Sequence, residues 1–276
     1  SLPPHSLPGD VLNEMRRQVK LMAKELNVIG LMNTQLAYQD GEIYVIEVNP
    51  RASRTVPFVS KATGAPIANI AARVMAGISL EEQNFTSEII PKHYSVKESV
   101  FPFNKFLGVD PFLGPEMRST GEVMGVGPDF PSAFDKAFLA AGDIIPTSGK
   151  VLVSLRTLDR DRLVELGRRL INQNFEIVAT RTNQEILKQA GLECTMVNKV
   201  SEGSPHIVDA IKNDEISLII NSTDDSQGLE DASVIRCQAL IHKIPCTTTV
   251  AAAFAMLDGL MSPNKLEVRS LQSIHK

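Results

Sequence analysis

The second part of the chain alternates short apolar segments with helical ones, and this pattern restricts its fold more than any other feature. Segments of strand length and of helix length follow one another from residue 151 to the end of the chain. The predicted strands are 151–155, 175–180, 195–198, 216–221, 244–247 and 266–271, and the predicted helices are 160–172, 183–190, 205–212, 231–242 and 250–260. Strands that alternate with helices form a parallel sheet covered on both faces. The sequence therefore predicts an α/β domain with right-handed crossovers.

Polar residues stand where these predicted strands give way to loops. They are Ser154, Thr180, Asn221, Thr223 and Thr248, and Lys199 follows a further strand. Ligands of such sheets bind at the carboxyl ends of the strands. Hydroxyl, amide and ammonium groups there can bind a phosphate together with helix N-termini. The same residue types also cap helices, so both interpretations stand at this point.

The first part of the chain has a different pattern. Residues 33–38 and 43–48 predict a β-hairpin that turns at Asp40-Gly41, and residues 57–62 predict a connector. Glu47 and Asn49 lie two residues apart, so they share one face of the second strand. Their oxygens suit Mg²⁺ shared with substrate phosphates. Arg51 and Arg54 then offer planar groups for phosphate oxygens, which together predicts half of a phosphoryl-transfer site. A solvated edge hairpin is the alternative.

The hairpin turn decides whether Gln35 joins this face. A two-residue turn at Asp40-Gly41 pairs Gln35 with Ile46 and directs it away from Glu47. A three-residue loop with Gly41 in a left-handed bulge position puts Gln35 beside Glu47. We predict the second arrangement.

Several segments carry a resemblance to one protein family. They include Glu47-Val48-Asn49-Pro50-Arg51 with Arg54, and the segments 60–64, 71–77, 96–98, 102–106 and 114–125. The chain closely resembles the carboxyl-terminal part of the carbamoyl phosphate synthase large subunit over nearly all of its 276 residues, less strongly after Gly142. The resemblance implies two domains. Residues 1–142 would be part of the second ATP-grasp (α+β) domain, and residues 143–276 a Rossmann-like, methylglyoxal-synthase-like effector domain.

The resemblance also implies a function. The parent would be a ligase that makes carbamoyl phosphate from bicarbonate, glutamine-derived ammonia and two ATP, for arginine and pyrimidine biosynthesis. It would work with a glutamine amidotransferase small subunit, as an oligomer. Mg²⁺ or Mn²⁺ would be the metal, with K⁺ as a further candidate ion. Within the first 40 residues the only glycines are Gly9 and Gly30, so the glycine-rich phosphate loop of an ATP-grasp enzyme is missing. We therefore expect a longer parent, and no activity from this chain alone.

Site residues carry over from the family position by position. Gln35, Glu47 and Asn49 would hold the metal, with Arg51 and Arg54 facing the phosphate during carbamate phosphorylation. Glu98 and Thr248 would bind ornithine. The residues that would bind a nucleotide effector, uridine or inosine monophosphate, are Ser154, Thr180, Lys199, Asn221 and Thr223.

The chain departs from its relatives around the predicted effector sites. The turn 180–183 has no glycine, so we expect the backbone to approach a phosphate less closely, with Arg181 as a substitute cation. Asp224 and Asp225 stand where basic residues are usual, and Cys246 stands where an aromatic residue is usual. We therefore predict weak binding of uridine monophosphate and a smaller effect on ornithine.

Composition restricts the other function classes. A net charge of −4 argues against binding to nucleic acid or to an anionic membrane. No apolar run approaches the roughly 20 residues of a membrane span. The three cysteines lack metal-type spacing, which favours a reducing cytoplasm. A methylglyoxal-synthase-type lyase and another ATP-grasp ligase are the alternative functions, and a binding module describes the fragment alone.

Overall fold

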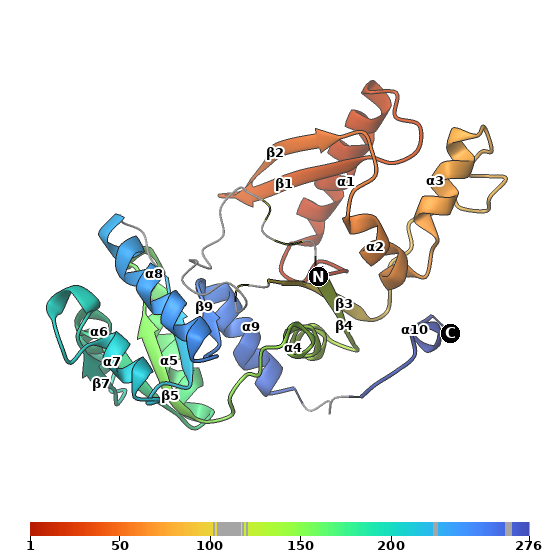
Figure 1. Ribbon diagram of the computed structural model, residues 1–276. Coiled ribbons are helices and arrows are strands. Elements are labelled where there is room, and N and C mark those ends of the chain that lie inside the picture. The colour runs from red at the N-terminus through yellow and green to blue at the C-terminus, as the bar shows by residue number, and fades with distance from the viewer. Residues whose placement is uncertain are drawn as a thin grey trace. The chain divides into compact units, whose positions relative to one another are not determined.

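The structure is a computed structural model that describes residues 1–101, 103, 117, 119, 121–222, 226–262 and 267–275 (Figure 1). The chain forms two compact units. The first unit comprises Ser1–Val96, Pro128–Phe130 and Glu267–Lys276, and the second comprises Lys97–Gly127 and Pro131–Leu266. Residues 97–127 and 131–142 thus group with the second unit, although the sequence analysis assigned them to the first domain.

The first unit contains three helices and a hairpin before residue 90. These elements are α1 (Gly9–Glu25), β1 (Asn33–Gln39), β2 (Glu42–Asn49), α2 (Thr55–Thr63) and α3 (Ile67–Met75). Strands β1 and β2 pair antiparallel, as predicted. Helix α2 replaces the predicted connector, because Pro57 lies in its first turn, where a missing N–H breaks no helical hydrogen bond. It ends at Gly64, whose φ of 75° is left-handed.

The hairpin turn differs from the prediction. Gln39 pairs with Glu42, so the loop contains only Asp40 and Gly41, whose φ angles are 52° and 86°. These positive angles match a two-residue type I′ turn. The register then shifts between Gln35 and Leu36, which leaves Ile46 as the extra residue of a β-bulge and pairs Gln35 with Glu47. The predicted pairing is therefore confirmed, but a bulge produces it and not a longer loop.

The second unit begins within β3 (Tyr94–Val100), which forms a two-stranded sheet with β4 (Gly121–Gly127). Helix α4 (Phe130–Ala141) lies against β4. A Cβ atom on Gly125 would come within 2.1 Å of the Ala133 carbonyl oxygen and 2.4 Å of the Ala137 nitrogen. Only glycine permits this close approach of helix and strand.

A five-stranded parallel sheet forms the rest of the second unit, which confirms the predicted α/β fold. Its strands are β5 (Gly149–Ser154), β6 (Phe175–Thr180), β7 (Thr195–Val197), β8 (Leu218–Asn221) and β9 (Cys246–Thr247). Their order in space is β7-β6-β5-β8-β9, and the pairs are parallel. After β5 the chain adds β6 and then β7 on one side of β5. It then crosses back and adds β8 and β9 on the other side of β5. This reversal is a topological switch point, where sheets of this type bind ligands.

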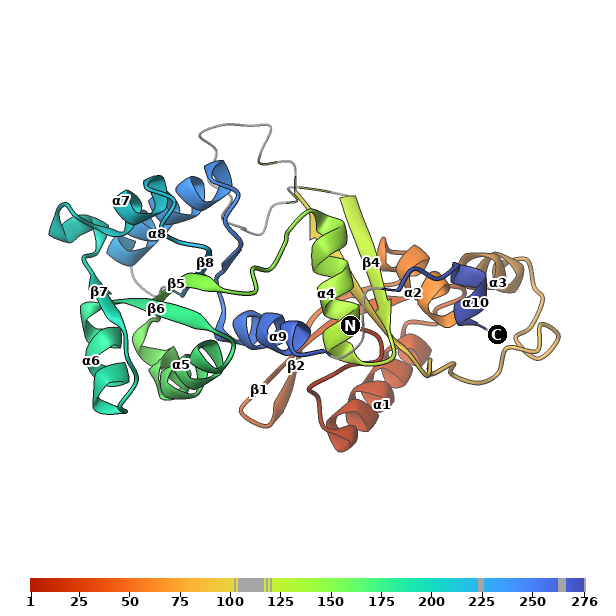
Figure 2. The ribbon, with the colours of Figure 1, turned by 90° about the horizontal axis from the view of Figure 1, so that it is seen from below.

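Helices cover both faces of this sheet (Figure 2). Buried side chains from α5 (Leu163–Asn172), α6 (Arg181–Gln189) and α9 (Val250–Leu260) form one core cluster. Those from α7 (Ile207–Lys212) and α8 (Ser226–Ile241) form the other. Two short 3₁₀ helices, η2 (Thr157–Arg162) and η3 (Val200–Glu202), follow β5 and β7.

The strand predicted over residues 266–271 is not present among the described residues of this segment. Residues 267–270 are irregular, and Leu271–Ile274 forms the short helix α10. This tail belongs to the first unit, where His275 Nε2 lies 2.7 Å from the Lys61 carbonyl oxygen. An apolar segment forms a stable strand only beside a paired neighbour, and the tail leaves the unit that contains the sheet.

Candidate functional site

The hairpin brings the three predicted metal ligands to one face. Gln35 lies directly opposite Glu47, and directly opposite residues of an antiparallel pair project to the same side. Asn49 Nδ2 donates a hydrogen bond of 2.9 Å to Glu47 Oε1. Asn33, which the sequence analysis missed, lies opposite Asn49 and two residues before Gln35. One carboxylate and three carboxamides are a donor set that fits a hard cation.

The two predicted phosphate arginines follow this face in the connection to α2. Arg51 is exposed, and its Nη1 donates to the Ala52 carbonyl oxygen at 3.0 Å. Arg54 is also exposed and immediately precedes α2. In the described ranges, no group of three His, Cys, Asp or Glu side chains offers another metal site. The amides of the hairpin are therefore the candidate ligands.

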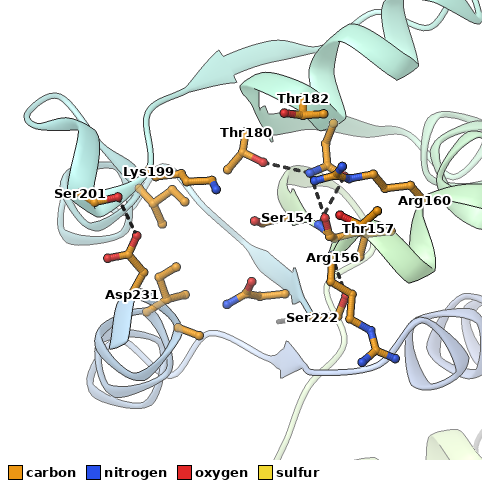
Figure 3. Close-up of a pocket in the computed structure, with 16 residues that line it drawn as sticks. Ser154, Arg156, Thr157, Arg160, Thr180, Thr182, Lys199, Ser201, Ser222 and Asp231 are labelled. Atoms are coloured by element: carbon orange, nitrogen blue, oxygen red, sulfur yellow. Dashed lines mark hydrogen bonds between the residues drawn. The ribbon is translucent and has the colours of Figure 1, made fainter. Parts of the chain in front are cut away.

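A pocket of about 270 Å³ lies at the carboxyl ends of the parallel strands, beside the switch point (Figure 3). Four of the five predicted nucleotide residues line it, and Thr223 lies outside the described residues. The four are Ser154, Thr180, Lys199 and Asn221. Lys199 extends into the pocket toward the side on which Ser154 and Thr180 lie (Figure 3).

Asn183 shapes this pocket, and the sequence analysis gave it no role. Its side chain is 2% exposed. Nδ2 donates to the Leu155 carbonyl oxygen at 3.3 Å and to Thr180 Oγ1 at 3.0 Å, and Oδ1 accepts from the Leu155 N–H at 3.3 Å. It thereby joins the loop after β5 to the start of α6. None of residues 180–183 has a positive φ, so the turn forms without glycine. The less close approach of its backbone to a phosphate stays a prediction.

The basic side chains of the pocket are Arg156, Arg160 and Lys199, and Arg181 is not among its lining residues. The predicted role of Arg181 as a substitute cation is therefore not supported. Arg156 Nε lies 2.7 Å from Asp159 Oδ2. Although burial raises the pKa of Asp159, hydrogen bonds from Arg156 and Ser222 and the charges of Arg156 and Arg162 bring it below its ordinary value.

Two buried donors at this pocket have no hydrogen-bond acceptor among the described residues. They are Arg160 Nε and Asn221 Nδ2. Buried donors are usually paired, so an unpaired one in a pocket wall points to an absent acceptor. Among the described residues that line the pocket, Asp231 is the single carboxylate, and it accepts a hydrogen bond of 3.1 Å from Ser201 Oγ. The arrangement is suited to an anion.

A second cavity, of about 620 Å³, contains both predicted ornithine residues. Glu98 on β3 and Thr248 after β9 line it together with Cys246. Asp143, Arg236 and Lys243 also line it, and sequence reasoning did not select them. Their positions on three separate segments left no local spacing that could have revealed them.

Comparisons with known proteins identify the class. A model of the carbamoyl-phosphate synthase L chain ATP-binding domain matches residues 2–83, and a model of the MGS-like domain matches residues 162–248. The fold and these matches define an α/β protein in which part of such an ATP-binding domain precedes an MGS-like domain.

Individual relatives specify the family further. The chain is 58% identical over 275 residues to the carbamoyl phosphate synthase large chain of Pseudomonas syringae pv. tomato. It is 57% identical to that of Pseudomonas putida and 54% identical to that of Vibrio cholerae. Each match covers 100% of this chain and 26% of the relative. Along its whole length the chain is therefore homologous to carbamoyl phosphate synthase large chains, of which it spans about a quarter. In the described ranges no helix has the length and apolar character needed to cross a membrane.

Proposed function

We propose that the chain is part of a carbamoyl phosphate synthase large chain, in which it supplies one side of the carbamate-phosphorylating site and the effector domain. The 54–58% identity along the whole chain and the two family matches support this. The parent would use ATP, bicarbonate and ammonia from a glutamine amidotransferase partner in the cytoplasm, for arginine and pyrimidine biosynthesis. All relatives named above are synthase large chains, which favours this function over a lyase or another ligase.

The register of the hairpin is the observation that carries the catalytic part of the proposal. Gln35, Glu47 and Asn49 would hold Mg²⁺ or Mn²⁺ through oxygen atoms on one strand face. When bound, the cation neutralises phosphate charge during transfer. Arg51 and Arg54 would orient the transferring group, because positioning and electrostatics supply most of the catalysis in phosphoryl transfer. K⁺ stays a further candidate ion.

Replacing Glu47 tests this assignment. Glu47→Gln keeps the shape of the side chain but removes the charge, so we expect the full-length enzyme to lose roughly 100-fold or more in carbamate phosphorylation. ATP formed from carbamoyl phosphate and ADP measures this half-reaction separately. Glu42→Gln is the matched control, since Glu42 lies on the same strand but pairs with Gln39 beside the turn. Wild-type rates in the Glu47 variant would contradict the proposal.

The effector part of the proposal assigns one ligand to each cavity. The pocket lined by Ser154, Thr180, Lys199 and Asn221 would take the phosphate of uridine or inosine monophosphate. Its unpaired donors Arg160 Nε and Asn221 Nδ2 support an anionic ligand. Thr223 remains a predicted contact from the family resemblance. The larger cavity with Glu98 and Thr248 would bind ornithine.

A further inference from the structure

The larger cavity contains two carboxylates that meet from separate elements. Glu98 lies on β3, and Asp143 follows the end of α4, and both line the same 620 Å³ space. All residues that line this cavity belong to the second unit. The basic side chains of Arg236 and Lys243 also line it, and Arg236 is only 7% exposed. The cavity thus offers both signs of charge in a partly apolar enclosure.

Within the part of the chain that the structure describes, neither carboxylate is ion-paired. Burial raises the pKa of Glu98 above its ordinary value, a backbone hydrogen bond from Ser99 opposes the rise, and the charge of Asp143 adds to it. Burial likewise raises the pKa of Asp143. Glu122 on the adjacent strand instead pairs with Lys97 at 3.2 Å. Glu98 is half-buried and Asp143 is exposed, yet both line one cavity and their charges repel, so a bound cation between them would be favourable.

We infer that Asp143 acts with Glu98 to bind the side-chain ammonium group of the amino acid in this cavity, and that Asp143 sets the preference for a charged over a neutral side chain. This inference rests on the proposed binding of ornithine at Glu98 and Thr248. An ammonium group has three N–H donors, so two carboxylates can share it. The α-carboxylate of the bound amino acid could then interact with the basic side chains of the cavity and with the Thr248 hydroxyl.

The two carboxylates explain how the cavity would reject a neutral analogue. Citrulline has nearly the length of ornithine but ends in an uncharged group. It would leave the half-buried Glu98 and the neighbouring Asp143 without a compensating charge, and unpaired polar groups in a binding site are a strong source of discrimination. Asp143→Asn removes one charge-assisted contact, so we expect ornithine to bind about 10- to 100-fold more weakly.

Calorimetry on the full-length protein tests the inference through two readouts, affinity and proton release. Carboxylates with raised pKa values hold protons at mildly acidic pH, and a bound cation favours their ionised forms. Ornithine should therefore release protons on binding, and its affinity should rise as the pH rises through the raised pKa values. Arg236, Lys243 and Cys246 also face the cavity; burial raises the pKa of Cys246 to about 12, so its thiol adds no titration near neutral pH.

Asp143→Asn should reduce the proton release and the discrimination between ornithine and citrulline, whereas Asp143→Glu should restore both. Asp135→Asn is the matched control, because burial also raises the pKa of Asp135 on α4, yet this residue does not line the cavity. If Asp143→Asn binds ornithine like the wild type while Glu98→Gln does not, the role of Asp143 is wrong and the proposed site stands. If neither substitution changes binding, the proposed ornithine site itself is wrong.

Discussion

At the scale of single residues, Asn183 and Gln35 show two ways in which the fold fixes the position of a polar side chain. Asn183 is buried, and its hydrogen bonds connect Thr180 to the loop that follows β5. Gln35 needs only its place in the hairpin, because pairing with Glu47 sets the face on which it lies. The first role depends on burial and the second on register.

Replacing Asn183 by Ala should destabilise the second unit and open the effector pocket. The change removes the hydrogen bonds to Leu155 and Thr180 and leaves buried backbone groups unpaired, which costs about 1–3 kcal/mol. Urea unfolding of the full chain, followed by circular dichroism, measures the change in the free energy of unfolding. Asn172→Ala removes an exposed amide at the end of α5 and should have little effect. Equal stability of the two variants would contradict this role of Asn183.

Asp224 and Asp225, together with the turn that lacks glycine, are the basis of the prediction of weak nucleotide binding. Both lie outside the described residues, and the prediction rests on their negative charge and on their place in the sequence after Asn221. Changing both to Asn should tighten binding of uridine monophosphate by roughly 2- to 10-fold, the range for partly screened charges. Titration calorimetry measures it, with Lys199→Ala as the variant that should lose affinity. Micromolar binding by the wild type would overturn the prediction.

At the scale of elements, α2 connects the candidate phosphate arginines, Arg51 and Arg54, to the carboxyl-terminal tail. It begins directly after Arg54, and its last turn meets two histidines. His275 Nε2 lies 2.7 Å from the Lys61 carbonyl oxygen, and His93 Nε2 lies 3.1 Å from that of Ala62. The last carbonyl groups of a helix lack intrahelical partners, so these rings stabilise its end. A Cβ atom on Gly64 would lie 2.9 Å from the His275 ring, which favours glycine there.

This contact should weaken in acid. Burial lowers the pKa of His93 below its ordinary value of 6.5, the hydrogen bond to Ala62 opposes this, and the neighbouring His275 lowers it further. The folded state therefore prefers the neutral ring, and the stability of the contact is lost as the pH falls through 6.5 toward the lowered pKa. Hydrogen exchange of residues 271–275 should be faster at pH 5.5 than at pH 7.5, beyond its intrinsic pH dependence. His93→Gln should remove most of this difference, and an unchanged difference would contradict the assignment.

At the scale of the whole molecule, the two units contain different kinds of site. The first unit presents its candidate metal ligands Gln35 and Glu47 on an exposed hairpin face. The second unit encloses its candidate ligands in cavities built around one parallel sheet. This contrast indicates that the hairpin site needs a further surface to enclose a substrate, whereas the effector cavities have walls of their own.

The chain on its own should therefore bind effectors but should not phosphorylate carbamate. Its first 40 residues contain only Gly9 and Gly30, so we expect no glycine-rich phosphate loop there to hold ATP against the hairpin. Calorimetry of the isolated 276-residue chain should detect ornithine binding and no micromolar ATP binding. The ornithine signal serves as the control for folding. Tight ATP binding that depends on Glu47 would show that the site is complete within this chain.

The sequence alone determined the parallel sheet and the hairpin, because these depend on local patterns of apolar and polar residues, while the family resemblance supplied the ligand assigned to each site, as with Glu98. Tertiary structure decided the remainder. The bulge at Ile46 depends on pairing between strands, and the tail became α10 and not a strand because it packs beside α2. The cavity that joins Glu98, Asp143 and Thr248 depends on the packing of β3, α4, α8 and β9. Residues far apart in sequence carry no shared periodicity, so only the folded chain brings their charges together.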